Sequence, residues 1–291
     1  MAKMAFKTER KTRTPRKTAA TKVMEVDNTV VESTETDAEI VERLRERFEI
    51  LDTMTQMTID GVVKGMVVTG PPGVGKSFGV EAVLEKNSIF DKLAGNRLKF
   101  GVEKGAASAI GLYKLLYNYA DRGHVLVLDD CDSVLYDETS LNLLKAALDS
   151  SKKRRISWNT DSRVLRHEGI PNQFEFNGSA IFITNIKFEH VRSKKLRDHL
   201  DALESRCHYL DLTIDTEREK VLRIKQIVED GMLDKYEFEP GAKEEILDFI
   251  DQNKKKLREL SLRMVLKLAD LKKSFPDRWT RVAEVSCMRR S

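Results

Sequence analysis

Positions 70–77 hold the residues with the most recognisable chemistry, because they read GPPGVGKS. This segment fills every fixed position of the phosphate-binding pattern G-x-x-x-x-G-K-S/T. Its glycines allow backbone N–H groups to point at phosphate oxygens, and a following helix adds its positive N-terminal end. Lys76 is expected to neutralise the β- and γ-phosphates, and the Ser77 hydroxyl is expected to bind Mg²⁺. The segment therefore predicts a site for a nucleoside triphosphate.

The residues on either side of this segment support that interpretation. Residues 62–69 are a β-branched run typical of a buried strand, and residues 78–86 have the apolar spacing of a helix start. A glycine-rich turn with a surface lysine is the alternative, but strand, loop and helix in this order favour nucleotide binding. The residues predicted to contact the nucleotide here are Gly70, Pro71, Pro72, Gly73, Val74, Gly75, Lys76, Ser77 and Phe78.

Two carboxylates and one amide are expected to complete the site. Asp129 and Asp130 follow the apolar run VLVL, and Asn185 follows the apolar run at 179–184. The carboxyl ends of neighbouring parallel strands meet at one edge of a sheet. There Asp129 would hold Mg²⁺ through water, Asp130 would act as a general base, and Asn185 would orient the attacking water. The alternatives are two acids that merely end a core strand and an asparagine in a turn.

Strands and helices alternate from residue 36 to residue 213. Strands are predicted at 62–69, 97–102, 124–128, 179–184 and 206–212, and helices at 78–86, 109–122, 138–150 and from Thr36. Such alternation indicates a parallel sheet covered by helices on both faces. After Asp215 only helices are expected, at 217–230, 242–252, 257–273 and from Trp279. The predicted fold class is α/β, a three-layer P-loop NTPase sheet followed by a small all-helical lid domain.

Three parts of the chain follow from these patterns: a basic tail and linker at 1–35, a nucleotide-binding α/β domain at 36–213 and a helical lid domain at 214–291. Residues 1–22 carry eight lysines and arginines against one acid, whereas the whole chain has a net charge of +4. With almost nothing to bury, this tail is expected to be disordered and to contact phosphate backbones without sequence preference. The alternatives are a solvated charge run and a segment that folds only within an assembly.

Composition narrows the class of protein. The hydrophobic fraction of 41% is ordinary for a globular protein of 291 residues, which is long enough to bury a large core. The three cysteines have neither disulfide nor zinc spacing, and no apolar run approaches the ~20 residues of a membrane span. We therefore expect a cytoplasmic protein with no membrane partner.

The order of these elements resembles the AAA+ ATPases over about residues 36–285. GPPGVGKS matches their Walker A motif, VLVLDD their Walker B motif, and IFITN their sensor 1 motif ending at Asn185. ALESRCHYLDL looks like the segment that presents an arginine finger, so Arg206 would reach the nucleotide of an adjacent subunit. LSLRMVLKL looks like sensor 2, so Arg263 would contact the γ-phosphate in its own subunit. Arg192 and Arg197 are competing fingers, and a plain surface salt bridge is the alternative role of Arg206.

This resemblance implies ATP and Mg²⁺ as ligands and a homo-oligomeric ring, commonly a hexamer. Where the family usually has glutamate after the Walker B aspartate, this chain has Asp130, whose carboxylate is one methylene shorter and could slow hydrolysis. The loop 102–108 lacks the aromatic residue of protein-threading relatives, which argues against an unfoldase. Lys104 in that loop is instead a candidate contact for a DNA backbone.

An insertion at 152–178 separates the helix after Walker B from the sensor 1 strand. It reads as a β-hairpin and resembles the pre-sensor 1 insertion of DNA-directed AAA+ members, such as branch-migration motors and helicases. Arg154, Arg155 and Trp158 combine positive charge with an aromatic ring, as in proteins that grip single strands. The alternative is a solvated hairpin with Trp158 packed beneath it.

Three functions are compatible with this sequence. The first is an ATP hydrolase that works as a ring to move or remodel DNA or a DNA-bound complex, as a translocase or helicase does. The second is an ATP-gated DNA-binding scaffold or loader with slow hydrolysis, which Asp130 favours. The third is a remodeller of a protein complex. A single AAA+ module with a basic tail also looks like ATPases encoded by tailed bacteriophages, and this resemblance implies the bacterial or phage-infected host cytoplasm as its location.

Overall fold

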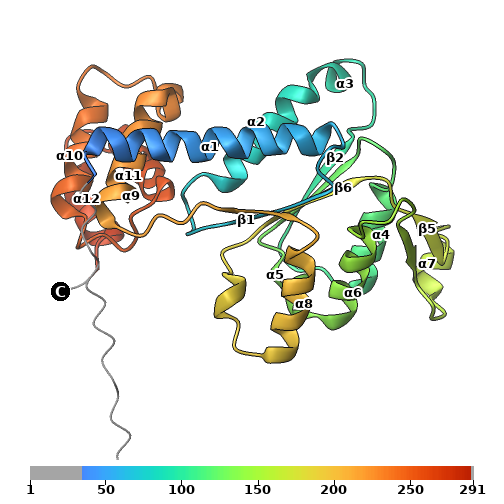
Figure 1. Cartoon of the computed structure of the whole chain (residues 1–291). Coiled ribbons are helices and arrows are strands. Elements are labelled where there is room, and N and C mark those ends of the chain that lie inside the picture. Colours follow the sequence, from blue (N-terminus) through green and yellow to red (C-terminus); the bar gives the residue numbers. More distant parts are fainter. Residues whose placement is uncertain (1–34, 290–291) are drawn as a thin grey trace, which may run out of the picture. The chain divides into compact units, whose positions relative to one another are not determined.

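Five parallel strands form the central sheet of the protein (Figure 1). The computed structural model describes residues 35–289, so the predicted basic tail lies outside the described residues. The strand order is β2-β3-β6-β1-β7. The strands are β1 (Gly65–Thr69), β2 (Phe100–Lys104), β3 (Val125–Asp129), β6 (Ser179–Ile183) and β7 (His208–Asp211).

Successive residues of each strand face opposite sides of the sheet, and each side packs against helices. Met66 and Val68 face a core shared with Leu51, Val80 and Leu84, and these last three lie on α1 (Asp37–Ile59) and α2 (Lys76–Asn87). Residues such as Val67 and Leu126 face the other core. The helices on that side are α4 (Ala109–Asn118), α5 (Asp132–Tyr136), α6 (Glu138–Ala147) and α8 (Lys194–Glu204). The predicted α/β fold with helices on both faces is confirmed.

The C-terminal part is helical, as predicted. It consists of α9 (Glu217–Ile227), a π-helix at Val228–Met232, a 3-10 helix at Asp234–Tyr236, α10 (Ala242–Asn253), α11 (Leu262–Ser274) and α12 (Trp279–Cys287). Ile224, Ile250, Val265 and Trp279 are among the residues of its separate hydrophobic core. This core makes the helices a unit that can pack against the phosphate loop.

Several predicted boundaries were wrong. β2 lies at 100–104 rather than 97–102, so Lys104 ends a strand and does not lie in a loop. α11 begins at Leu262 because the Ser261 hydroxyl accepts a hydrogen bond from the Met264 N–H, whereas Leu257 forms an isolated bridge with Met288. The sequence analysis did not assign α8, a short 3-10 helix at Phe188–His190, or α3 (Ile89–Leu93).

The insertion at 152–178 is the hairpin that the sequence predicts. β4 (Arg155–Ser157) pairs antiparallel with β5 (Gln173–Glu175), and a short helix, α7 (Arg163–His167), lies between them where only a polar stretch was expected. Two expected DNA contacts of this hairpin are wrong. Arg154 is buried, because its guanidinium donates to the carbonyls of Ala147 and Gly178. The Trp158 ring is half-buried against the Tyr113 ring, with 5.6 Å between centroids.

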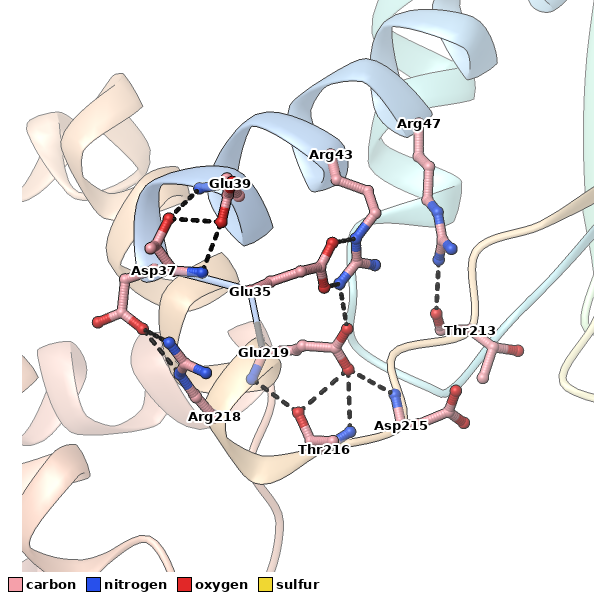
Figure 2. Close-up of polar contacts among 11 residues, drawn as sticks. Glu35, Asp37, Glu39, Arg43, Arg47, Thr213, Asp215, Thr216, Arg218 and Glu219 are labelled. Carbon is pink, nitrogen blue, oxygen red and sulfur yellow. Dashed lines mark hydrogen bonds and ion pairs between the residues drawn. The ribbon is translucent and has the colours of Figure 1, made fainter. Parts of the chain in front are cut away.

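Helix α1 is tied to the start of the helical part by charged side chains (Figure 2). Arg43 donates to both carboxylate oxygens of Glu35, at 3.0 and 2.8 Å, and to Glu219 at 2.8 Å. Glu219 itself belongs to the capping box that starts α9. At its other end, α1 packs along α2, where Gln56 accepts a hydrogen bond from Asn87. Within residues 35–289, no helix is both long and apolar enough to cross a membrane.

Candidate nucleotide-binding site

The residues predicted to do chemistry meet at the carboxyl edge of the sheet. β3 ends at Asp129, which lies in register with Ile183 at the end of β6. Ile183 is in turn in register with Val68 of β1, two residues before Gly70. Because the three strands are parallel neighbours, the phosphate loop, Asp129 and Asn185 are brought together as predicted.

The phosphate loop has the backbone conformation that its glycines permit. Gly75 caps α2 with φ 106°, a region open to glycine but strained for other residues, so that α2 starts at Lys76. Gly73 is needed for another reason, since a Cβ at this position would lie 2.7 Å from the Cβ of Ser261. The Leu262 N–H donates to the Gly73 carbonyl at 2.8 Å. The first turn of α11 therefore sits directly on the phosphate loop.

A chain of hydrogen bonds joins three of the predicted catalytic residues. The Lys76 ammonium donates to the Asn185 Oδ1 at 2.7 Å, and the Asn185 Nδ2 donates to the Asp130 Oδ1 at 3.0 Å. Lys76 also donates to the Gly70 carbonyl at 2.6 Å and to the Pro71 carbonyl at 3.0 Å. Burial lowers the pKa of Lys76 to about 8, although the charges of Asp130 and Asp129 oppose this.

Asp130 has an unusual backbone conformation, with φ 52°. Aspartate tolerates this left-handed region better than longer side chains do, because its short carboxylate can bond locally. The Asp130 N–H donates to the Ile183 carbonyl at 2.9 Å, which fixes the turn against the end of β6. The conformation therefore gives a physical reason for aspartate at this position.

Ser77 and Asp129 present two oxygen ligands side by side. The Ser77 hydroxyl donates to the Asp129 Oδ1 at 2.9 Å, and the Asp129 side chain is 6% exposed. A hydroxyl and a carboxylate fit Mg²⁺, which keeps several waters and phosphate oxygens as its other ligands. Among residues 35–289, no cluster of three or more histidine, cysteine or acidic side chains could hold a metal by itself. The site therefore suits a metal that arrives with a nucleotide.

Lys104 is part of this arrangement and is not the loop residue that the sequence analysis predicted. Its ammonium lies 3.3 Å from the Asp129 Oδ2 and 2.7 Å from Glu81. Lys104 and Asp129 are paired across β2 and β3, which explains why their side chains meet. Lys104 therefore ends a strand and its charge faces the metal ligand, while its expected contact with DNA stays a prediction.

A cavity of about 600 Å³ runs from these polar groups to an apolar end. Lys76, Ser77, Asp130 and Asn185 line the polar end. Arg263, in the first turn of α11, lines the same cavity and is exposed. The apolar lining consists of Pro72, Phe78, Ile227, Met232, Leu262 and Leu266. Apart from Arg263, the lining residues from the helical part were not predicted, because sequence spacing does not show which helix faces pack over the phosphate loop. Val74 instead packs beneath the loop with Ile40 and Leu44.

Arg206 lies away from this cavity. It precedes β7, whose first residue His208 is in register with Met66 of β1, so Arg206 lies at the amino edge of the sheet. Its guanidinium donates to the Ala202 carbonyl at the end of α8. The competing fingers lie elsewhere: Arg197 donates to the Val191 carbonyl, and Arg192 lines a second cavity that includes Gly70 and Asn185.

Comparisons with known proteins show which proteins this chain resembles. No protein-family model matches the chain. Over 245 residues the chain is 34% identical to the "Uncharacterized 36.7 kDa protein in nrdC-mobD intergenic region" of Enterobacteria phage T4. The matched residues cover 83% of this chain and 73% of that protein.

Solved structures with weaker likeness include replication initiator DnaA bound to AMPPCP and single-stranded DNA (TM-score 0.43, 14% identity, 88% of this chain and 66% of that one). Another is the Aeropyrum pernix ORC2 protein in its ADP form (TM-score 0.45, 17% identity, 90% of this chain and 71% of that one). A third is the Aeropyrum pernix ORC1 protein in complex with DNA (TM-score 0.39, 12% identity, 91% of this chain and 65% of that one). The chain thus spans just under two thirds of the DnaA and ORC1 chains.

Proposed function

We propose that this chain, which belongs to the same family as the phage T4 protein, is an ATPase of the AAA+ type that acts on DNA as an oligomer. The observation that carries the proposal is the hydrogen-bonded chain Lys76–Asn185–Asp130 next to the Ser77–Asp129 pair, all at the edge where the phosphate loop ends. A phosphate-binding loop alone supports binding, whereas a carboxylate and an amide beside it support hydrolysis.

Each residue of the site has a role in this proposal. The N–H groups of the phosphate loop and the Lys76 ammonium bind the β- and γ-phosphates, and Arg263 reaches the γ-phosphate from α11. The Asn185 amide and the Asp130 carboxylate hold the attacking water, and Asp130 accepts its proton. Ser77 and Asp129 would hold Mg²⁺, which neutralises phosphate charge when bound. The apolar end of the cavity takes the nucleobase.

The proposal includes a second copy of the chain. Arg206 lies at the amino edge of the sheet and the phosphate loop follows the carboxyl end of β1. Arg206 is therefore too far away to act on the nucleotide of its own chain. We assign it to the transition-state charge of a neighbouring copy, in a closed ring.

DNA as the substrate rests on surface charge. Arg155 on β4 is exposed, as are Lys152 and Lys153 before it and Arg163 on α7. Phosphate backbones bind such positive surfaces without sequence preference. The basic segment at 1–22 would add to this surface. Arg154 and Trp158 are left out of the proposed contact, because both pack inward.

A second candidate function is an ATP-gated scaffold or loader on DNA. The short carboxylate of Asp130 favours it, because a base that is one methylene shorter than glutamate reaches less far toward the attacking water and would slow hydrolysis. A third candidate, a remodeller of a protein complex, has no specific observation in its favour. Strand displacement by the purified protein would support the motor, and DNA-retained assemblies that dissociate on hydrolysis would support the scaffold.

The test is a complementation assay of ATP hydrolysis. Lys76→Ala removes nucleotide binding and Arg206→Ala removes the proposed finger, so each variant alone should be inactive. A mixture should recover hydrolysis, because Lys76→Ala subunits supply Arg206 to the intact sites of Arg206→Ala subunits. Full turnover by Arg206→Ala alone would contradict the role in trans.

DNA dependence is measured on the same proteins with single-stranded DNA, duplex DNA or neither. Arg155→Ala combined with Arg163→Ala should weaken DNA binding, and Arg281→Ala, an exposed arginine of α12, serves as the matched control. The DNA assignment fails if neither kind of DNA binds to the wild-type protein or changes its rate of hydrolysis.

A further inference from the structure

A second cavity, of about 830 Å³, opens beside the phosphate loop and carries more positive than negative side chains. Its lining includes Lys187, Arg192 and Lys220, and Asp215 is its acidic lining residue. We call it the basic cavity. Within residues 35–289, the side chains of the three cationic residues make no hydrogen bond or ion pair with another residue. Three unpaired cations in one hollow attract an anion.

The basic cavity meets the cavity of about 600 Å³ described above, which we call the nucleotide cavity, at Asn185. Asn185 lines both cavities, and its Oδ1 accepts a hydrogen bond from the Lys76 ammonium at 2.7 Å. Gly70 and Pro71 also line the basic cavity, and their carbonyls accept from the same ammonium at 2.6 and 3.0 Å. A γ-phosphate bound by Lys76 would therefore lie at the wall that the two cavities share.

The two cavities differ in the part of a nucleotide that they suit. The apolar side chains proposed to hold the nucleobase, such as Phe78 and Leu266, line the nucleotide cavity and are absent from the described lining of the basic cavity. These contacts and the phosphate loop would keep ADP in the nucleotide cavity after hydrolysis. The other product, inorganic phosphate, is an anion without a base, and the unpaired cations lie on the basic side of Asn185.

The basic cavity is far larger than one phosphate ion and is open to water. His190, Arg192 and Ser193 line it and are exposed. A wide and open hollow with cations on its wall suits a hydrated ion in passage better than a ligand that is enclosed on all sides. The size and exposure of the cavity therefore favour a product on its way out.

We propose that the basic cavity binds the inorganic phosphate cleaved from ATP and passes it to water. This inference rests on the proposed function, because the ion is a product of the proposed hydrolysis. The phosphate moves past Asn185, from the ammonium of Lys76 toward those of Lys187 and Lys220, while ADP stays in the nucleotide cavity. A phosphate that already occupies the basic cavity blocks the departure of the next one.

The first experiment measures phosphate binding without hydrolysis. Inorganic phosphate is titrated into Lys76→Ala protein, in which the phosphate loop has lost its ammonium, and binding is followed by the ³¹P NMR line width. A second protein adds Lys187→Gln and Lys220→Gln to this change. The matched control adds Lys194→Gln instead, because Lys194 is exposed and lies near these residues in sequence but does not line the basic cavity.

The Lys76→Ala protein should still bind phosphate, because the basic cavity is intact. The protein with the two glutamines should need at least about fivefold more phosphate for half-saturation, since two cations of the cavity are gone. The Lys194→Gln control should bind as its Lys76→Ala parent does. Thermal unfolding near the parent value shows that the variants fold.

The second experiment tests the passage of the product. Added inorganic phosphate should inhibit ATP hydrolysis by the wild-type protein, and a higher ATP concentration should not relieve this inhibition, because the phosphate blocks the exit and not the ATP site. With Lys187→Gln and Lys220→Gln in the otherwise wild-type chain, half-inhibition should need at least about fivefold more phosphate. Lys194→Gln should be inhibited as wild type is.

DNA carries the same phosphate chemistry, so binding of single-stranded and duplex DNA is measured on the variant with the two glutamines and should stay near that of wild type. The proposal is overturned if Lys76→Ala protein binds no phosphate or if the two glutamines leave phosphate binding unchanged. Inhibition that ATP relieves, or a loss of DNA binding in place of phosphate binding, also overturns it. These outcomes leave the proposed ATPase standing, whereas a wild-type protein that forms no phosphate from ATP contradicts the proposed function itself.

Discussion

Arg154→Ala should destabilise the protein, whereas the same change at its neighbour Arg155 should not. Arg154 is 6% exposed, and its guanidinium donates to the Ala147 carbonyl at 3.0 Å and to the Gly178 carbonyl at 2.9 Å. It also lies over the Phe176 ring, 5.2 Å from the centroid. Arg155, the first residue of β4, is exposed.

The size of the effect follows from these contacts. Each hydrogen bond from a charged donor contributes about 1.5–3 kcal/mol, and truncation leaves two carbonyls without their partner. Against this loss, burial lowers the pKa of Arg154, so the buried charge itself costs free energy that truncation recovers. A net destabilisation of about 3 kcal/mol is expected, which corresponds to a fall in Tm of roughly 6–12 °C for a domain of this size.

Thermal unfolding followed by circular dichroism measures both variants in the same buffer. Arg155→Ala should stay within about 0.5 kcal/mol of wild type, as exposed substitutions usually do. Arg154→Lys is a useful intermediate, because it keeps the charge but cannot reach both carbonyls with one planar group. Equal Tm values for Arg154→Ala and Arg155→Ala would contradict this prediction, because the two hydrogen bonds of Arg154 would then contribute nothing to stability.

Three further predictions concern the nucleotide site. Lys104→Met removes the ammonium beside Asp129 from a side chain that is 58% exposed. After discounting for solvent screening, this ion pair is worth up to about 1 kcal/mol, so half-saturation with Mg²⁺ in a nucleotide-binding titration should need about fivefold less metal. An unchanged titration would contradict this prediction. Asp130→Asn keeps a short side chain at the left-handed position, so folding should persist while ATP hydrolysis falls by about 10²-fold or more at similar ATP affinity; undiminished hydrolysis would remove Asp130 as the base. Because burial lowers the pKa of Lys76 from 10.5 to about 8, its charged form costs the folded protein free energy below pH 8, and this cost is relieved as pH rises toward 10.5. ATP binding needs that charge, so affinity measured by calorimetry should weaken as pH rises above about 8, and affinity independent of pH up to 10 would show that the lysine stays charged.

Local patterns were enough to predict how the core of the site assembles. Asp129 and Asn185 each follow a buried strand, and parallel strands in register carry such residues to one edge whatever lies between them in sequence. The lining that comes from the helical part, such as Ile227 and Leu262, depends on how that part packs on the phosphate loop. No spacing in the sequence encodes that packing, so these residues were missed.

The charge of a side chain was the least reliable guide to whether that side chain is exposed. Every residue of the run Lys152–Arg155 is positively charged, yet the Arg154 side chain turns inward to two carbonyls just before β4 begins. Lys104 was assigned to a surface loop, because the predicted strand ended two residues too early. Its true partner, Asp129, lies on the adjacent strand and becomes visible only from the register.

Helix α1 gives the molecule a mechanical property. Its 23 residues span ~35 Å as one rigid rod. Its N-terminal end is tied to α9 through Arg43 and Glu219 (Figure 2). Its far end is hydrogen-bonded to α2, the helix that starts at Lys76. Arg47 donates to the Thr213 carbonyl, in the segment where the chain passes from β7 to α9. Because α1 contacts both helices, a displacement of α9 would reach the helix that carries the phosphate-binding lysine through this rod.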